Sequence, residues 1–244
     1  MSAPATILHI PHSASAIPLE LRSTLLLTDA ELATELNAMT DAFTAELFET
    51  TVPAVRCVYS VSRLVADPER FADDEEEPMA ARGMGVIYTR TSQGRPLRAA
   101  PDEPTRSALL ARYYRPHHDA LTQATDTALA AHGRCRILDC HSFAAVALPY
   151  ELDQAQDRPD ICLGTDAFHT PAALYDKAHA LFAAAGFTVA RDRPFAGTFV
   201  PGKHYRKTRA VESLMIELNR GLHGVATGAY PDTGCVGGYE RLRG

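Results

Sequence analysis

The chain alternates short apolar runs of strand length with longer stretches of helical periodicity, and this alternation is what most constrains its fold. Apolar residues three and four apart predict helices, whereas short continuous apolar runs bounded by turn residues predict buried strands. Strands that alternate with helices are typical of a largely parallel sheet covered on both faces. The sequence therefore predicts an α/β fold, a three-layer sandwich with a central mixed, mostly parallel sheet. The expected strands cover 5–10, 54–61, 134–143, 157–166, 187–195 and 213–222, and the expected helices cover 28–50, 104–132 and 170–186.

A single domain over residues 1–244 is the expected organisation. A chain of 244 residues suits one large α/β domain better than two small ones, and neither an internal repeat nor a linker divides it. The acidic run at 73–77 is expected to be a solvated loop, and the glycine-containing segment 83–97 a loop or turn.

The charge balance limits the classes of partner. With 24 Lys+Arg against 30 Asp+Glu, the formal net charge is −6. This balance argues against a nucleic-acid partner, because binding to phosphates needs a basic face. A few local arginines can still bind a small anionic substrate, so that class of ligand stays open.

No stretch of the sequence reads as a membrane span or a secretory signal, so we expect no membrane partner and a cytoplasmic location. The five cysteines, at 57, 135, 140, 162 and 235, are an odd number without a CxxC pair. We interpret them as reduced and mostly buried thiols, neither disulfides nor metal ligands.

Four polar residues lie at or just beyond the ends of predicted strands: His12, Asp67, His141 and Glu217. In open α/β sheets, functional groups gather beyond the carboxyl ends of the strands. A lone histidine after a strand is more often a hydrogen-bonded loop residue than a metal ligand. However, His12 and His141 share their context, since each ends a buried strand and each is followed by serine. Two imidazoles with one carboxylate and an open position are the ligand pattern of catalytic zinc.

Six short segments follow one another along the chain: PHS (11–13), SRLVADPER (62–70), DCHS (139–142), RPDICLGT (158–165), GKHYRK (202–207) and MIELNR (215–220). In this order they resemble the N-formylglutamate amidohydrolase (deformylase) family, which is distantly related to the zinc carboxypeptidases. The resemblance runs from about residue 7 to residue 222 and implies a zinc-exopeptidase-like fold. It also implies one zinc ion and a water molecule that attacks an amide.

The resemblance implies that His12 and His141 are the two imidazole ligands and that Glu217 is the general base. Glu217 lies between apolar neighbours, where burial raises the pKa of a carboxyl group toward the range that a base needs. The alternative is that Glu217 forms a buried ion pair with Arg220.

The third metal ligand stays open between two aspartates. Carboxypeptidase-like sites have a glutamate three residues after the first histidine, but Ser15 occupies that position here. Asp41 falls where the family has an acidic residue, and it is the preferred candidate. Asp67 is the other candidate, although by resemblance it would orient the His12 ring as a hydrogen-bond acceptor. Glu69 stands where the related pattern has asparagine, which changes the residues available to the substrate.

Arginines are the expected anchors for substrate carboxylates, because a guanidinium group binds a carboxylate through two hydrogen bonds. Arg70 is expected to bind substrate, and Arg63 to take part in catalysis as well; the alternative for either is an ion pair with the acidic run 73–77. By resemblance, further substrate-binding residues are Arg158, His204, Tyr205 and Asn219, although His204 and Tyr205 also suit an ordinary surface pair.

Together these expectations describe zinc-dependent hydrolysis of N-formyl-L-glutamate to formate and glutamate, as in one bacterial route of histidine degradation. The first alternative keeps this chemistry and changes the substrate to another N-acyl amino acid or a small peptide. The second is a ligand-binding relative without a metal. The expected partner is thus a small anionic N-acyl amino acid, and a homo-oligomer is compatible with the sequence.

Overall fold

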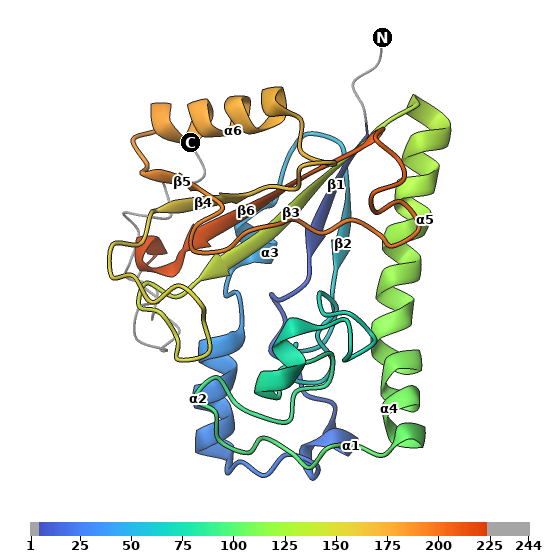
Figure 1. Cartoon of the computed structure of the whole chain (residues 1–244), viewed down its shortest axis with the longest axis vertical. Coiled ribbons are helices and arrows are strands. Elements are labelled where there is room, and N and C mark those ends of the chain that lie inside the picture. The colour runs from blue at the N-terminus through green and yellow to red at the C-terminus, as the bar shows by residue number, and fades with distance from the viewer. Residues whose placement is uncertain (1–4, 224–244) are drawn as a thin grey trace.

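The computed structural model describes residues 5–223, which form a six-stranded sheet with helices on both faces (Figure 1). The strand order is β2-β1-β3-β6-β4-β5. The first four strands in this order are parallel, β4 is antiparallel to β6, and β5 is parallel to β4. The expected mixed, mostly parallel sheet is confirmed. The strands are β1 Ala5–Ile10, β2 Ala54–Val58, β3 Cys135–Phe143, β4 Ile161–Gly164, β5 Val189–Arg191 and β6 Val211–Asn219.

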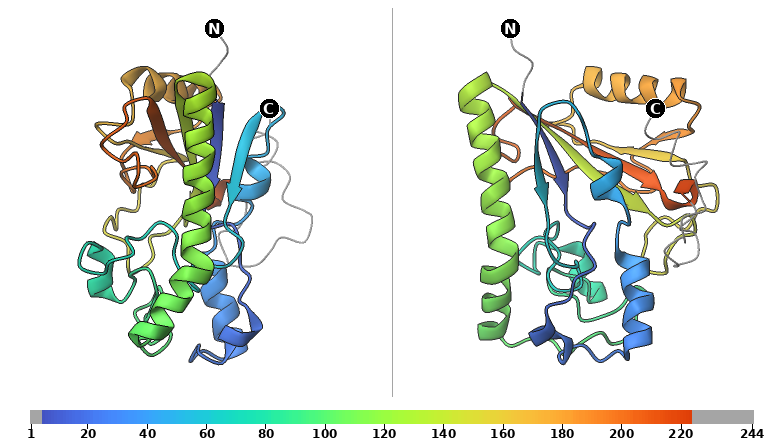
Figure 2. Two further views of the ribbon diagram at one scale, coloured as in Figure 1. Left: turned by 90° about the vertical axis from the view of Figure 1, so that its right-hand side faces the viewer. Right: turned by 180° about the vertical axis from the view of Figure 1, so that it is seen from behind.

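One long helix covers one face of the sheet, and two other helices cover the opposite face (Figures 1 and 2). Helix α5 (Arg115–His132) packs its apolar residues on β1, β2 and β3, around Ile7 and Ile137. Helices α3 (Thr44–Leu47) and α6 (Ala172–Ala184) pack on the opposite face, around Leu138 and Ile216. The layers therefore follow the order helix, sheet, helix, as the alternation of apolar segments predicts.

Helix α4 (Glu103–Leu109) continues through a π-helical turn (Leu110–Tyr114) into α5, so the predicted helix over 104–132 is confirmed. The remaining short elements are α1 (Leu19–Arg22) and the 3₁₀ turns Pro78–Arg82 and Arg220–His223.

The predicted helix over 28–50 is wrong in its middle. Helix α2 (Asp29–Met39) begins with a capping box in which Thr28 and Glu31 satisfy each other's backbone amides. It ends at Thr40, where the chain turns so that the Asp41 amide donates a hydrogen bond to the carbonyl of His12. Phe43 takes a left-handed conformation with φ of 65° before α3 begins. Apolar periodicity continues across this break, which is why the sequence reads as one helix.

The alternation of side chains along β3 and β6 gathers polar groups on the α5 face of the sheet. Asp139 and His141 lie two residues apart on β3, so both point to the same face as Ile137. The parallel register pairs Asp139 with Met215 and His141 with Glu217. The polar cluster forms where these strands extend past α5, and the apolar residues of the same strands fill the core beneath the helix.

Four of the five cysteines, at 57, 135, 140 and 162, are buried free thiols, as expected, and Cys235 lies outside the described residues. Among the described helices, none combines the length and apolar character needed to cross a membrane.

A close approach between two backbone segments gives one test of the fold. Gly164 ends β4, and a Cβ atom there would collide with the carbonyl oxygen of Gly197 and the side chain of Met215. We expect Gly164→Ala to lower the free energy of unfolding by about 1–3 kcal/mol, the usual cost of overpacking. The measurement is the midpoint of denaturant unfolding.

Gly202 provides the matched control, since a Cβ atom there meets nothing within 4 Å and its φ lies outside the left-handed region. Gly202→Ala is expected to change the free energy of unfolding by less than about 0.5 kcal/mol. Equal effects of the two substitutions would contradict the close packing at Gly164.

Candidate metal centre and active site

His12 lies two residues beyond β1 and is almost fully buried. Its Nε2–H donates to Oδ1 of Asp67 at 2.9 Å, and the Nδ1 atom is buried with no hydrogen-bond partner. When the ring is neutral, the bond to Asp67 fixes the proton on Nε2 and leaves the lone pair on Nδ1. The structure therefore presents an oriented, unpartnered nitrogen ligand.

His141, on β3, is equally buried and has carboxylates at both ring nitrogens. Nδ1 lies 3.0 Å from Oδ2 of Asp41, and Nε2 lies 3.1 Å from both Asp139 and Glu69. Burial alone would lower the pKa of this imidazole, but the charges of Glu69 and Asp139 raise it well above its ordinary value. Without a metal ion, the ring is therefore held as a cation.

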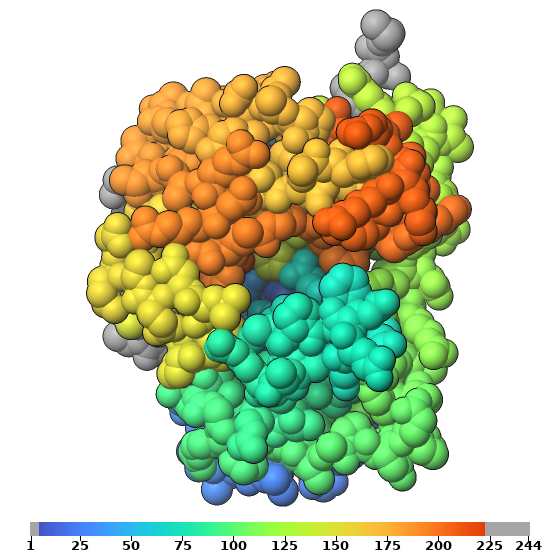
Figure 3. Space-filling model, in the orientation of Figure 1, coloured from blue at the N-terminus to red at the C-terminus, as the bar shows by residue number. Residues whose placement is uncertain are grey.

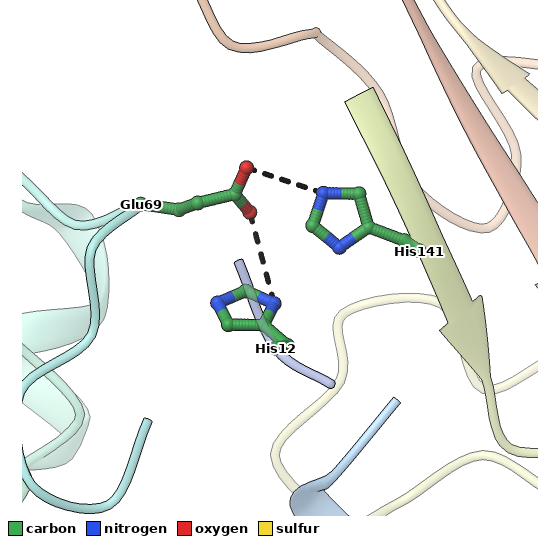
Figure 4. Close-up of side chains that lie close together, drawn as sticks. All are labelled: His12, Glu69 and His141. Carbon is green, nitrogen blue, oxygen red and sulfur yellow. Dashed lines mark hydrogen bonds and ion pairs between the residues drawn. The ribbon is translucent and has the colours of Figure 1, made fainter. Parts of the chain in front are cut away.

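Two carboxylates face both imidazoles. Oδ2 of Asp41 lies 3.7 Å from Nδ1 of His12. Oε2 of Glu69 lies 3.9 Å from the same nitrogen atom (Figure 4). The ligand atoms of His12, Glu69 and His141 all lie within 4.8 Å of one another. The unpartnered Nδ1 of His12 and this set of nitrogen and oxygen donors fit a divalent metal ion.

Asp67 connects this centre to two arginines. Arg63 donates from Nε and Nη2 to Oδ2 of Asp67 at 3.1 and 2.7 Å, and the hydroxyl of Tyr88 donates to the same oxygen. Burial would raise the pKa of Asp67, but Arg63 and His12 hold it well below its usual range. Arg70 lies farther away, with Nε 3.7 Å from Asp67. Arg63 thus pairs with Asp67 and not with the acidic run 73–77.

Glu217 lies on β6 beside His141 and is 7% exposed. Its Oε2 atom has no hydrogen-bond partner, and burial raises its pKa to about 8. Arg220 lies nearby, but its guanidinium group donates to the carbonyls of Asn37, Ala38 and Thr40. Glu217 is therefore a carboxyl group free to exchange a proton, and it does not form the buried ion pair considered as its alternative.

A second row of polar residues lies behind His141. Asp139 accepts hydrogen bonds from His9 Nδ1 at 2.8 Å and from the backbone amide of Phe199 at 2.8 Å. His9 Nε2 in turn lies 3.0 Å from Nε2 of His117, on α5. This network links helix α5 and the loop at Phe199 to His141 through one carboxylate.

The sequence reasoning missed His9, Asp139 and His117, and it placed Glu69 only near the substrate. The alternation Asp139-Cys140-His141 on a strand was the available signal for Asp139, because residues two apart share a face. His9 is three residues before His12, inside an apolar run, and carried no such signal.

Two adjoining cavities open onto these residues. The smaller, of about 170 Å³, is lined by His12, Asp41, His141 and Glu217 among others. The larger, of about 430 Å³, lies on the other side of Glu69 and Arg70, which line both. Figure 3 shows a hollow on this face between the segments that follow β2 (teal), β3 (yellow) and β5 (orange).

The structure brings some of the predicted residues to these cavities. Arg63 and Arg70 line the smaller one, and Tyr205 lines the larger one. Arg158 is not among the lining residues and instead forms a buried ion pair with Glu151. His204 instead hydrogen bonds to Asp126, at 2.9 Å, and to Thr208. Asn219 donates to the carbonyl of Pro159 and accepts from the amide of Gly221, which are contacts that hold the end of β6.

The protein thus has an α/β fold, with buried histidines and carboxylates around a cavity beyond the carboxyl ends of its parallel strands. The chain matches the model of the N-formylglutamate amidohydrolase family over residues 5–223. It belongs to that family of amidohydrolases.

Solved structures agree with this assignment. The crystal structure of N-formylglutamate amidohydrolase from Ralstonia eutropha JMP134 is similar with a TM-score of 0.80 and 22% identity, covering 99% of this chain and 91% of that one. The structure of gene product Atu2144 from Agrobacterium tumefaciens has a TM-score of 0.68 and 22% identity, covering 92% of this chain and 83% of that one. At such identities the likeness shows the fold. None of the curated proteins compared with the chain matches it.

Acid is expected to reveal the buried neutral state of His117. Burial and the neighbouring His9 lower its pKa to about 3. Between about pH 6.5 and 4.5 the unfolded chain gains a proton at this residue and the folded chain does not. Stability therefore falls with pH by up to about 1.4 kcal/mol per unit from this group.

The test compares the wild type with His117→Gln in metal-free protein, by denaturant unfolding at several pH values. Groups remote from His117 act equally in both proteins, so the difference reports on His117 and its contact with His9. The variant is expected to lose about 2 kcal/mol less than the wild type over this range. Parallel curves would contradict a neutral buried His117.

Proposed function

We propose that the protein is a zinc-dependent amidohydrolase that cleaves the N-acyl amide of an N-acyl amino acid. N-formyl amino acids are the substrate class that we favour. The observation that carries the proposal is the unpartnered Nδ1 of His12, which faces His141 and two carboxylates in the cavity that also holds Glu217. Membership of an amidohydrolase family supports it. N-formyl-L-glutamate is the substrate in the family's name.

The residues proposed to hold the metal are His12, His141 and Asp41. Oδ2 of Asp41 lies near Nδ1 of both rings, at 3.7 and 3.0 Å. Each ring then has a carboxylate at Nε2, Asp67 for His12 and Asp139 for His141, which is the arrangement that orients ligating imidazoles.

Glu69 is the competing third ligand because its carboxylate also spans both rings. We favour Asp41 since its side chain is more deeply buried, at 7% exposed against 17% for the Glu69 side chain. Asp41 also accepts a hydrogen bond from the backbone amide of Ser142, and this bond fixes the Asp41 carboxylate beside His141. Glu69 lies on the wall between the two cavities, where it contacts the substrate in this proposal.

A zinc ion at this site would polarise the acyl carbonyl and lower the pKa of the attacking water. Glu217 accepts the proton of that water and delivers it to the departing amide nitrogen. Arg63, fixed by Asp67 and Tyr88, stabilises the negative charge that develops on the acyl oxygen. Arg70 binds the carboxylate of the substrate.

Replacing Glu217 tests the base. Glu217→Gln keeps the shape of the side chain but cannot accept the proton. We expect its kcat for formate release from N-formyl amino acids to fall at least about a hundredfold, with zinc content unchanged.

Glu212→Gln is the matched control, because Glu212 lies on the same strand and pairs with Arg136 on the opposite face. Its kcat is expected to stay within about twofold of the wild type. Near-normal turnover in Glu217→Gln would remove Glu217 from the proposed role.

Metal content tests the ligands. The wild type is expected to bind about one zinc per chain, and Asp41→Asn to weaken this binding by more than about a hundredfold. Glu69→Gln is expected to weaken it by less than about tenfold. Competition with a chelator measures both.

The reverse order of the two losses would reassign the third ligand to Glu69. Wild-type protein that takes up less than about 0.1 equivalent of added zinc would contradict the metal site and favour a ligand-binding relative without catalysis.

A further inference from the structure

The arginines that line the smaller cavity differ in the partners that their guanidinium groups contact within the protein. Arg63 is paired with Asp67. Arg220 donates to three carbonyls at the end of α2. Arg70 differs from these, because its ionic contact to Asp67 is 3.7 Å long and its Nε atom has no hydrogen-bond partner.

The arginines that line the larger cavity limit the number of carboxylates that can bind there. A buried carboxylate needs hydrogen-bond donors that the protein does not already use, because a buried anion without them is costly. Arg70 is the one arginine among the described residues that line the larger cavity, and its Nε atom has no hydrogen-bond partner. The larger cavity therefore offers donors for one substrate carboxylate.

Acidic side chains on the wall of the larger cavity disfavour a second substrate carboxylate there. Glu69 lines both cavities, and Asp139 lines the larger one. The Asp139 carboxylate lies 2.8 Å from His9 Nδ1 and 3.1 Å from His141 Nε2. A second substrate carboxylate in the larger cavity would lie beside these two acidic side chains, with Arg70 as the one arginine or lysine among its described lining residues.

The lining of the larger cavity is instead suited to an apolar group. Six of its lining residues carry bulky aromatic or apolar side chains: Phe71, Tyr114, Phe199, Val200, Tyr205 and Met215. The polar ends of some neighbours are already bonded, since Tyr114 donates to the carbonyl of Arg70 and His118 to that of Pro68. At about 430 Å³ the cavity has room for a large side chain.

Building on the proposed amidohydrolase activity, we propose that the substrate is an N-formyl or other short N-acyl amino acid with a single carboxylate and a large apolar side chain. The carboxylate binds Arg70, on the wall between the cavities. The side chain, which leaves the same carbon atom, enters the larger cavity. The acyl group enters the smaller cavity of about 170 Å³ beside Glu217.

The reaction needs no further reactant. The water oxygen forms a bond to the acyl carbon, and the carbon–nitrogen bond breaks. The proton taken up by Glu217 passes to the amine, so the products are the short acid and the free amino acid.

The first experiment measures kcat/KM of the zinc-loaded protein on N-formyl-L-phenylalanine, N-formyl-L-glutamine and N-formyl-L-glutamate. Glutamine has nearly the size of glutamate without its charge, so it separates charge from volume. We expect phenylalanine to exceed glutamate by at least about tenfold, the discrimination that an apolar pocket gives, with glutamine between them. Glutamate as the best substrate would overturn this inference and leave the amidohydrolase proposal intact.

A second experiment does not depend on turnover. Calorimetry with the zinc-loaded protein measures binding of the products L-phenylalanine and L-glutamate, and phenylalanine is expected to bind at least about fivefold more tightly. If no formyl amino acid is cleaved, the proposed function fails, and the order of these two affinities still decides the inference. Tighter binding of glutamate would overturn it.

A substitution in the wall of the larger cavity tests whether the side chain of the substrate binds there. Phe71 is half exposed at the larger cavity, and we expect Phe71→Ala to lower kcat/KM for N-formyl-L-phenylalanine and the affinity for L-phenylalanine at least about fivefold. Values for N-formyl-L-alanine should change less than about twofold. Leu181→Ala, which removes an exposed apolar side chain on α6, is the control and should change neither. Equal effects on both substrates would contradict the placement in the larger cavity.

Discussion

The parallel pairing of β3 with β6 is the constraint on which the site depends. Its register places His141 beside Glu217 and Asp139 beside Met215, and the strand alternation turns all four side chains to the face that α5 leaves uncovered. A slip of one residue would move these groups to the opposite face, among the apolar residues that pack on α6. The apolar residues between them on the strands therefore fix the geometry of the polar ones.

Buried charges around the centre compensate one another in pairs. Asp67 lies between His12 and the guanidinium of Arg63, and Asp139 lies between His141 and His9. Such ions would be costly alone, because burial removes their hydration. The histidines and arginines give each carboxylate several charged hydrogen bonds, and they hold the rings that face the smaller cavity in fixed orientations. Glu217 is outside this compensation, and it is the group whose pKa burial raises.

The sequence predicted the parts of the structure that depend on local periodicity and on strand ends. The strands that carry His141 and Glu217 were found because they are continuous apolar runs, and the sheet brings their polar ends together as expected. The break of the helix at Thr40 could not be predicted, because it is made by the Asp41 amide bonding to His12, a residue far along the chain. The same holds for Glu69 and His117, whose positions beside the site depend on how a loop and a helix pack on the sheet.

The amide of Phe199 joins the loop after β5 to Asp139, and it does so through the main chain. Every amino acid except proline carries this donor. The side chains of this loop can therefore be exchanged while the loop stays attached to the carboxylate behind His141. Substitutions in the wall of the larger cavity can therefore change which ligand is preferred. The positions of the buried histidines and carboxylates beneath this wall do not depend on those side chains.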